Sequence, residues 1–134
     1  MLSQPFIILM ADDDIEDLEL MEEAIRDYVG DLHFHKVHNG RAVLEYLESK
    51  TDDHLPCLIV LDYNMPELNG SQVLSELSKK PRYNHIPKII FSTSNAPTHV
   101  QECKENGAID YFVKPTNMRD LKMVVQKLMS YCMI

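Results

Sequence analysis

The chain alternates short strand-like stretches with segments whose apolar residues recur at helical spacing, and it does so five times. The strand-like stretches read PFIILMA, HFHKVH, CLIVLD, KIIFS and IDYFV. CLIVLD is apolar without interruption up to its final aspartate, as expected of a strand that is covered on both sides. This alternation predicts a mostly parallel sheet with helices on both faces.

Helical segments follow each of these strands. The segment over residues 97–106 has the thinnest apolar face, with only Val100 and Cys103, and it ends at Asn106-Gly107. The last helix is predicted to begin near Asn117, with Asp120 as its capping-box partner. The other predicted core positions are Ile15, Leu18, Met21, Ile25 and Tyr28 or Val29 in the first helix; Val43, Leu44 and Leu47 in the second; Val73, Leu74 and Leu77 in the third; and Met118, Leu121, Val125 and Leu128 in the last.

Size and charge exclude several classes of protein. A chain of 134 residues without a linker or repeat predicts one domain over residues 1–134 and no output domain. Its apolar runs fall short of the ~18 residues that a membrane helix needs, and the first residues do not resemble a signal peptide. A net charge of −8 argues against direct binding of nucleic acid, although residues 63–134 alone carry +3.

The three cysteines, Cys57, Cys103 and Cys132, are odd in number, widely spaced and without a CxxC pair. This usage is typical of reduced core thiols in a cytosolic protein rather than of a disulfide or a metal site. The histidines within residues 33–38 lack partner cysteines and helical spacing, so they are expected to be exposed rather than metal-binding.

Polar side chains stand where four of the predicted strands end. The first strand ends at Asp12 and Asp13, the third at Asp62, the fourth at Ser92 and the fifth at Lys114. Right-handed crossovers bring the carboxyl ends of parallel strands to one edge of the sheet, where open α/β sheets bind ligands. Neighbouring carboxylates at this edge repel one another, and a bound cation would relieve that repulsion.

The segments ILMADD, IVLDYNMPELNG, PKIIFSTS and DYFVKP, in this order, closely resemble the receiver domain of two-component response regulators. The similarity covers essentially the whole chain. It implies a doubly wound, CheY-like α/β fold with a five-stranded parallel sheet of order 2-1-3-4-5 and five helices. IEDLELMEEAIRD and KKPRYNHIPK also resemble stand-alone receivers that work beside phytochrome-type histidine kinases.

The resemblance implies a role for each polar residue at the strand ends. Asp62 would be the phosphoacceptor, and Lys114 would neutralise phosphoryl charge. Ser92 would be the switch hydroxyl, and Tyr111 the aromatic residue that turns inward when Ser92 moves. Pro115 matches the position of a cis peptide in the family, which would aim the preceding lysine inward.

The resemblance also implies a Mg²⁺ site. Asp13, Asp62 and the backbone carbonyl of Asn64 would be direct ligands, and Asp12 would act through a water. Magnesium would cancel the repulsion between Asp62 and the incoming phosphoryl oxygens. Asp14 has a different expected task, because Asp14 and Asp17 have the spacing of a helix cap.

The function that follows is that of a cytoplasmic response regulator rather than an enzyme acting on other molecules. A histidine kinase or a phosphotransfer protein would phosphorylate Asp62, and residues 96–134 would then change their binding to a downstream protein or to a second copy. The last helix carries side chains that suit an adaptable contact surface or, equally, an ordinary helix tail: Met123, Met129, Tyr131, Met133 and Ile134.

Other readings agree less well with the residues. An aspartate-nucleophile phosphohydrolase needs a second acid where Asn64 stands, and an EF-hand from Asp12 needs glycine where Asp17 stands. A nucleotide-binding fold needs a glycine-rich phosphate loop, which the acidic first turn is not. A degenerate receiver that binds partners without phosphorylation remains the main alternative.

Four further positions are expected to affect access to the site, hydrolysis of the phosphoaspartate or the shape of the neighbouring loop. Thr93 departs from the alanine or glycine that the family more often has there, and its bulk is expected to narrow access to the phosphate. Asn64 and Ser94 would flank the water that attacks the phosphoaspartate, and neither is a strong base. Gly70 permits a tight loop beside the site or is an ordinary turn glycine.

Overall fold

Five parallel strands form one sheet in the order β2-β1-β3-β4-β5 in the computed structural model, which describes residues 6–132. The predicted sheet order is therefore confirmed. The strands are β1 (Ile7–Ala11), β2 (His33–Val37), β3 (Leu58–Leu61), β4 (Lys88–Ser92) and β5 (Asp110–Val113). The helices are α1 (Ile15–Val29), α2 (Gly40–Glu48), α3 (Gly70–Ser78), α4 (Pro97–Glu105) and α5 (Met118–Cys132), with short 3-10 turns at Asp52–His54 and Pro81–Tyr83.

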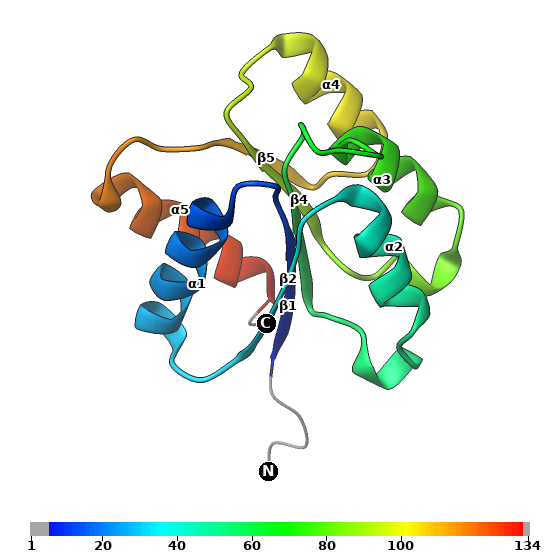
Figure 1. Ribbon diagram of the computed structural model, residues 1–134, viewed down its shortest axis with the longest axis horizontal. Helices are drawn as coiled ribbons and strands as arrows, with labels where there is room; N and C mark the ends of the chain where they lie inside the picture. Colours follow the sequence, from blue (N-terminus) through cyan, green and yellow to red (C-terminus); the bar gives the residue numbers. More distant parts are fainter. Residues whose placement is uncertain (1–5, 133–134) are drawn as a thin grey trace.

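The chain places β2 on one side of β1 and then places β3, β4 and β5 on the other side. This change of side distributes the helices over the two faces of the sheet. Helices α1 and α5 cover one face of the sheet, and α2, α3 and α4 cover the other (Figure 1). Successive side chains of a strand point to opposite faces. Ile8 and Met10 of β1 therefore pack in the core beneath α1 and α5, whereas Leu9 and Ala11 pack beneath α2 to α4.

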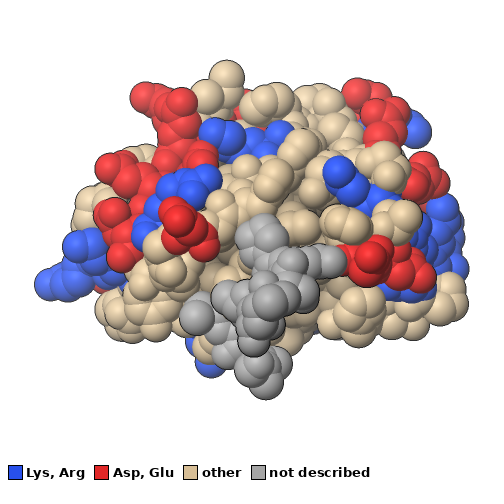
Figure 2. Space-filling model, turned by 90° about the horizontal axis from the view of Figure 1, so that it is seen from below, with Lys and Arg blue, Asp and Glu red and all other residues tan. Residues whose placement is uncertain are grey.

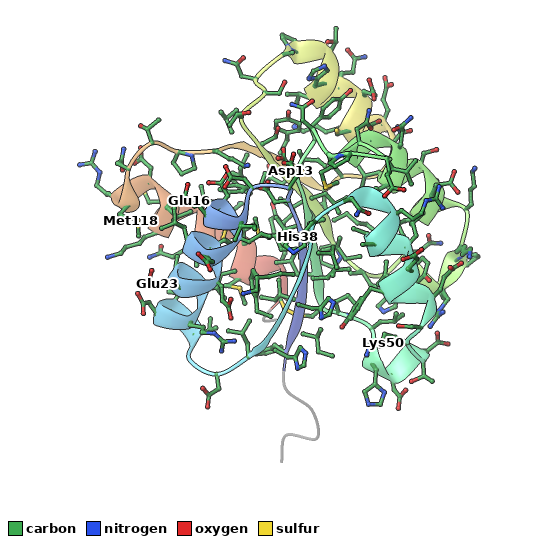
Figure 3. All side chains as sticks on the ribbon, viewed as in Figure 1. Asp13, Glu16, Glu23, His38, Lys50 and Met118 are labelled. Atoms are coloured by element: carbon green, nitrogen blue, oxygen red, sulfur yellow. A yellow bond between two sulfur atoms is a disulfide. The ribbon has the colours of Figure 1, made fainter. Side chains whose placement is uncertain are left out.

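The first residues of two helices are an exception to the predicted core. Ile15 is 60% exposed and Met118 is 47% exposed, although both were predicted to be buried. Each is the first residue of its helix, and Met118 lies well to the side of the strands, where the loop from β5 meets α5 (Figure 3). At the other end of α1, Val29 packs against the core and Tyr28 is exposed.

Helix α4 has the thin apolar face that its sequence predicts, since Cys103 is its only buried residue. Polar contacts supplement this small core. At its carboxyl end, the Asn106 side-chain amide donates to the Ser71 hydroxyl of α3 at 2.8 Å. In α5, Met129 is buried in the core, as in an ordinary helix tail, while Met123 is 63% exposed.

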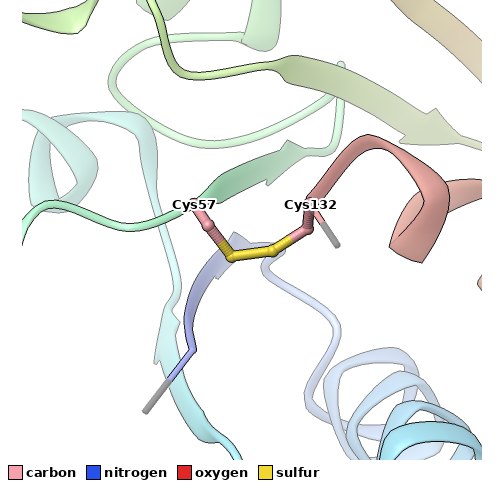
Figure 4. The surroundings of a disulfide bond; sticks show 2 residues. All are labelled: Cys57 and Cys132. Carbon is pink, nitrogen blue, oxygen red and sulfur yellow. A yellow bond between two sulfur atoms is a disulfide. The ribbon is translucent and has the colours of Figure 1, made fainter. Parts of the chain in front are cut away.

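Cys57 and Cys132 form a disulfide (Figure 4). The expectation of reduced thiols is therefore wrong for these two residues. Cys57 directly precedes β3 and Cys132 ends α5, which runs back across the sheet to the side where the strands begin. Their Cα atoms are 5.4 Å apart although 75 positions separate them in the sequence, and spacing alone does not reveal such a contact. Cys103 is free and buried, as predicted.

The face at the amino-terminal ends of the strands carries both signs of charge. Figure 2 views this face and shows acidic and basic side chains interspersed on both flanks. Ion pairs join Glu22 to Arg26 and Lys36, and Arg82 to Asp52. Within residues 6–132, none of the helices has the length and apolar character needed to cross a membrane. Met133 and Ile134, predicted to extend the contact surface of α5, lie outside the described residues.

Candidate functional site

Strand β1 delivers two aspartates to the carboxyl edge of the sheet (Figure 3). The Asp12 N–H still donates to the Val37 carbonyl, so Asp12 continues the ladder with β2. Its side chain is fully buried, and a carboxylate oxygen accepts from the Asp14 N–H at 2.9 Å. Burial raises the pKa of Asp12 to about 6, although a hydrogen bond from Lys114 opposes this shift. Asp13 is exposed to solvent.

Strand β3 places Asp62 beside this pair. The Asp62 N–H donates to the Ala11 carbonyl at 3.0 Å, and the side chain is nearly buried. The Asn64 N–H lies 3.4 Å from a carboxylate oxygen of Asp62. Gly70 backs this turn closely: a Cβ atom there would lie 2.6 Å from the Asp62 carbonyl oxygen. The close approach, rather than an unusual φ angle, explains the glycine.

Asp12, Asp13 and Asp62 form a cluster that can hold a metal ion, because each offers a carboxylate oxygen within 4.8 Å of the others. Hard divalent cations such as Mg²⁺, Mn²⁺ and Ca²⁺ prefer oxygen ligands of this kind. The convergence expected from the strand ends is therefore present. Asn64 is exposed and lines the same surface pocket as Asp13.

Lys114, at the end of β5, is the cation of the site. Its Nζ atom donates to Asp12 at 2.7 Å and to Asp17 at 2.7 Å, and lies 3.3 Å from Asp62. Burial alone would lower the pKa of Lys114, but the hydrogen bonds to Asp12 and Asp17 and the charge of Asp62 outweigh it and raise the pKa.

The Lys114–Pro115 peptide is trans, as are all peptide bonds of residues 6–132. The expected cis peptide is therefore wrong. The three carboxylates around Nζ account for the inward orientation of the lysine without it.

Asp17 is the site residue that sequence reasoning missed. Asp14 caps α1 as predicted, with its side chain accepting from the N–H groups of Glu16 and Asp17. The Asp17 side chain instead pairs with Lys114. Its position in the first turn of α1, directly after the acidic turn, is the signal from which this contact could have been suspected.

The two predicted switch residues share a contact with the loop after β4. Ser92 is fully buried, and its hydroxyl accepts from the Ser94 N–H at 3.2 Å. The Tyr111 hydroxyl donates to the Ser94 carbonyl at 2.8 Å. Ser92 and Tyr111 are thus joined through one residue, Ser94, which is itself exposed to solvent in part.

A second group of polar contacts ties α4 to the residue after Asp62. The rings of Tyr63 and His99 are stacked, and the Tyr63 hydroxyl donates to Glu102 at 3.3 Å. His99 Nδ1 lies 2.6 Å from the Ser94 hydroxyl oxygen. These contacts depend on how α4 lies against the sheet, and for that reason no pattern in the sequence predicts them.

Fold and site together define a doubly wound α/β domain with a carboxylate site for a divalent cation at the carboxyl edge of its sheet. Residues 8–126 match the response regulator receiver domain family, and the chain belongs to that family. It is therefore a signalling domain of two-component systems. Receiver domains bind a divalent metal, are characteristically phosphorylated on aspartate, and interact with histidine kinases or phosphotransfer proteins.

Curated relatives include two-component response regulators of plants. ORR13 of Oryza sativa subsp. japonica is 32% identical over 118 residues, which are 88% of this chain and 93% of that protein. ARR7 of Arabidopsis thaliana is 30% identical over 129 residues, and there the chain spans only 62% of the relative's length.

Solved structures agree with this assignment. The Mn²⁺-bound response regulator Rcp1 has a TM-score of 0.82 and 29% identity, covering 94% of this chain and 93% of that one. RPA3017, from red light signalling in R. palustris, has a TM-score of 0.83 and 27% identity, covering 96% and 94%. The phosphorylated cyanobacterial phytochrome regulator RcpA, at 24% identity, shares the fold with a TM-score of 0.85 and covers 97% and 94%. The predicted likeness to phytochrome-associated receivers is thus confirmed at the level of the fold.

Proposed function

We propose that this receiver accepts a phosphoryl group on Asp62 in a Mg²⁺-dependent reaction and then changes the binding surface formed by residues 96–134. The observation that carries the proposal is the position of Asp62, between the acids of β1 and the ammonium group of Lys114. A carboxylate nucleophile needs no general base to remove a proton before it attacks phosphorus.

The residues of the chain divide the task among them. Asp13, Asp62 and the carbonyl of Asn64 would hold Mg²⁺, with Asp12 acting through a water. The ion supplies charge neutralisation for the phosphoryl oxygens when it is bound. A carboxylate oxygen of Asp62 attacks phosphorus while the bond to the histidine nitrogen of the donor breaks. Lys114 donates to a phosphoryl oxygen as negative charge gathers there.

The output would be a rearrangement rather than catalysis on another molecule. Ser92 would turn its hydroxyl toward the phosphoryl group, and Tyr111 would follow because both are tied to Ser94. A single new hydrogen bond is enough to bias a two-state equilibrium by a few kcal/mol. The changed surface would contact a downstream protein or a second copy of the chain.

Labelling with a small phosphodonor such as acetyl phosphate tests the proposal. In Mg²⁺ the mass should rise by one phosphoryl group, and in EDTA it should not change. Asp62→Asn should abolish labelling, whereas Asp13→Asn should weaken metal binding and reduce it. Undiminished labelling of Asp62→Asn would refute the assignment, and no labelling of the wild type in Mg²⁺ would favour a receiver that works without phosphorylation.

A further inference from the structure

The ammonium group of Lys114 has three N–H donors, and three carboxylates surround it. The distances from Nζ to Asp12 and Asp17 are both 2.7 Å, whereas the distance to Asp62 is 3.3 Å. Two donors are therefore held by short charge-assisted hydrogen bonds, and the third, toward Asp62, is held loosely. The loosely held donor is the one that a phosphoryl group on Asp62 would receive.

The two short bonds differ in how they respond to a metal ion. Asp12 belongs to the acidic cluster, so a water on a bound cation would compete with Lys114 for its carboxylate. Asp17 is not a member of that cluster. It lies in the first turn of α1 and reaches Lys114 from the side of the helix. Its bond to Lys114 is thus the one bond of the three that does not share a carboxylate with the metal or with the phosphoryl group.

We propose that Asp17 is a positioning residue, which holds the Lys114 ammonium group over Asp62 while metal binding and phosphoryl transfer alter the other two carboxylates. This inference rests on the proposed function, because it assigns to Asp17 a task in the phosphorylation of Asp62. Lys114 would keep its position through the reaction because α1 supplies a fixed anchor, and only the third donor would change partner.

The partial exposure of Asp17 limits the size of the effect. Its side chain is 29% exposed, whereas that of Asp12 is fully buried. Solvent therefore screens the Asp17 pair in part, and the loss of one charge-assisted bond should slow the reaction by about five- to tenfold rather than abolish it.

Kinetics with acetyl phosphate in saturating Mg²⁺ test this inference. Asp17→Asn should lower the rate constant of phosphorylation about five- to tenfold and change the dissociation constant of Mg²⁺ less than about twofold. Asp17→Glu, which keeps the charge, should restore most of the rate. Glu16→Gln is the matched control, because Glu16 is an exposed acid in the same helical turn (Figure 3), and its rate should equal that of the wild type.

A double-mutant cycle separates positioning from a general effect of charge or stability. If Asp17 acts through Lys114, then Asp17→Asn should cause no further loss of rate in a Lys114→Met background. An equal loss in both backgrounds would overturn the inference, and so would a rate for Asp17→Asn equal to that of Glu16→Gln. Either result leaves the proposed function standing, since that proposal fails only if Asp62 itself is not labelled.

Discussion

The aromatic ring of Tyr63 stacks on the ring of His99 with centroids 4.0 Å apart and planes inclined by 12°. Tyr63 follows Asp62 directly, and His99 lies in the first turn of α4. The stack therefore connects the expected phosphoacceptor with the helix that has the smallest apolar core. His99 also contacts the Ser94 hydroxyl, so its ring touches both the loop after β3, through Tyr63, and the loop after β4, through Ser94.

His99→Ala should release this end of α4. We expect the free energy of unfolding to fall by about 1–2 kcal/mol, because a stacked pair and a side-chain hydrogen bond are lost together. Urea unfolding measures the loss, and hydrogen exchange should show faster exchange of the α4 amides in particular. Thr98→Ala, at an exposed neighbour in the same helix, is the control. Unchanged exchange in α4 would show that the stack does not hold the helix.

Asp12 should make the metal-free protein less stable as the pH rises from about 4 to 6. Its pKa is raised from 3.8 to about 6 in the folded state, so the folded protein binds more protons than the unfolded chain in this window. The contribution to the free energy of unfolding is greatest below pH 3.8 and is lost as the pH passes 6. At about 1.4 kcal/mol per pKa unit, the contribution of Asp12 amounts to at most about 3 kcal/mol. It is an upper bound because the hydrogen-bonded Lys114 also influences the protonation of Asp12.

Urea unfolding in EDTA across this range, on the wild type and Asp12→Asn, measures the effect. Carboxylates such as Glu22, whose pKa is lowered mainly by a hydrogen bond from Lys36, act in the opposite direction in both proteins. The difference between the two proteins therefore isolates Asp12. Parallel stability curves from pH 4 to 7 would contradict the prediction.

The alternation of strands and helices and the acid cluster were predictable because both depend on rules that act along the chain, whereas the strand order was implied by the resemblance to receiver domains. Strand and helix periodicity specified the alternation, and parallel strands necessarily bring Asp12, Asp13, Asp62 and Lys114 to one edge. The contacts of Asp17 and His99 were not predictable in this way. They depend on how helices α1 and α4 are placed relative to the sheet, and that placement is the outcome of packing in three dimensions.

The disulfide between Cys57 and Cys132, at the end of the sheet where the strands begin, also depends on packing in three dimensions and was not predictable from the sequence. Reduction should lower the free energy of unfolding by about 2–4 kcal/mol, because the bridge closes a loop across 75 positions. Mass spectrometry should show a gain of about 2 Da on reduction, as each sulfur acquires a hydrogen. Cys57→Ser is the control, since a reductant should not change its stability. Equal effects of the reductant on both proteins would contradict this prediction.

Thr93 should limit the access of small phosphodonors to the site. Thr93 is exposed and directly follows the buried Ser92 at the carboxyl edge of the sheet, so we expect its methyl and hydroxyl groups to narrow the entrance to the site. Thr93→Ala should raise the rate constant of phosphorylation by acetyl phosphate a few-fold without changing the affinity for Mg²⁺. Thr93→Ser, which removes only the methyl group, should give an intermediate rate. A slower or unchanged rate in Thr93→Ala would remove the steric argument.

Ser92 should be required for the site to influence the distant surface. The Ser94 N–H bonds the Ser92 hydroxyl and the Ser94 carbonyl accepts from Tyr111, so movement of Ser92 shifts the same loop that holds the aromatic ring. Beryllofluoride with Mg²⁺, which mimics the phosphoryl group, should shift amide NMR signals around Asp62 and across residues 96–134. In Ser92→Ala the shifts should be confined to the residues around Asp62.

Ser130→Ala provides the matched control for this experiment. Ser130 is exposed, and its hydroxyl bonds only the Lys127 carbonyl of its own helix. Its remote shifts should equal those of the wild type. Tyr111→Phe should give an intermediate response, because the ring remains while its bond to Ser94 is lost. Full remote shifts in Ser92→Ala would show that the signal reaches α4, β5 and α5 by a route that does not include this hydroxyl.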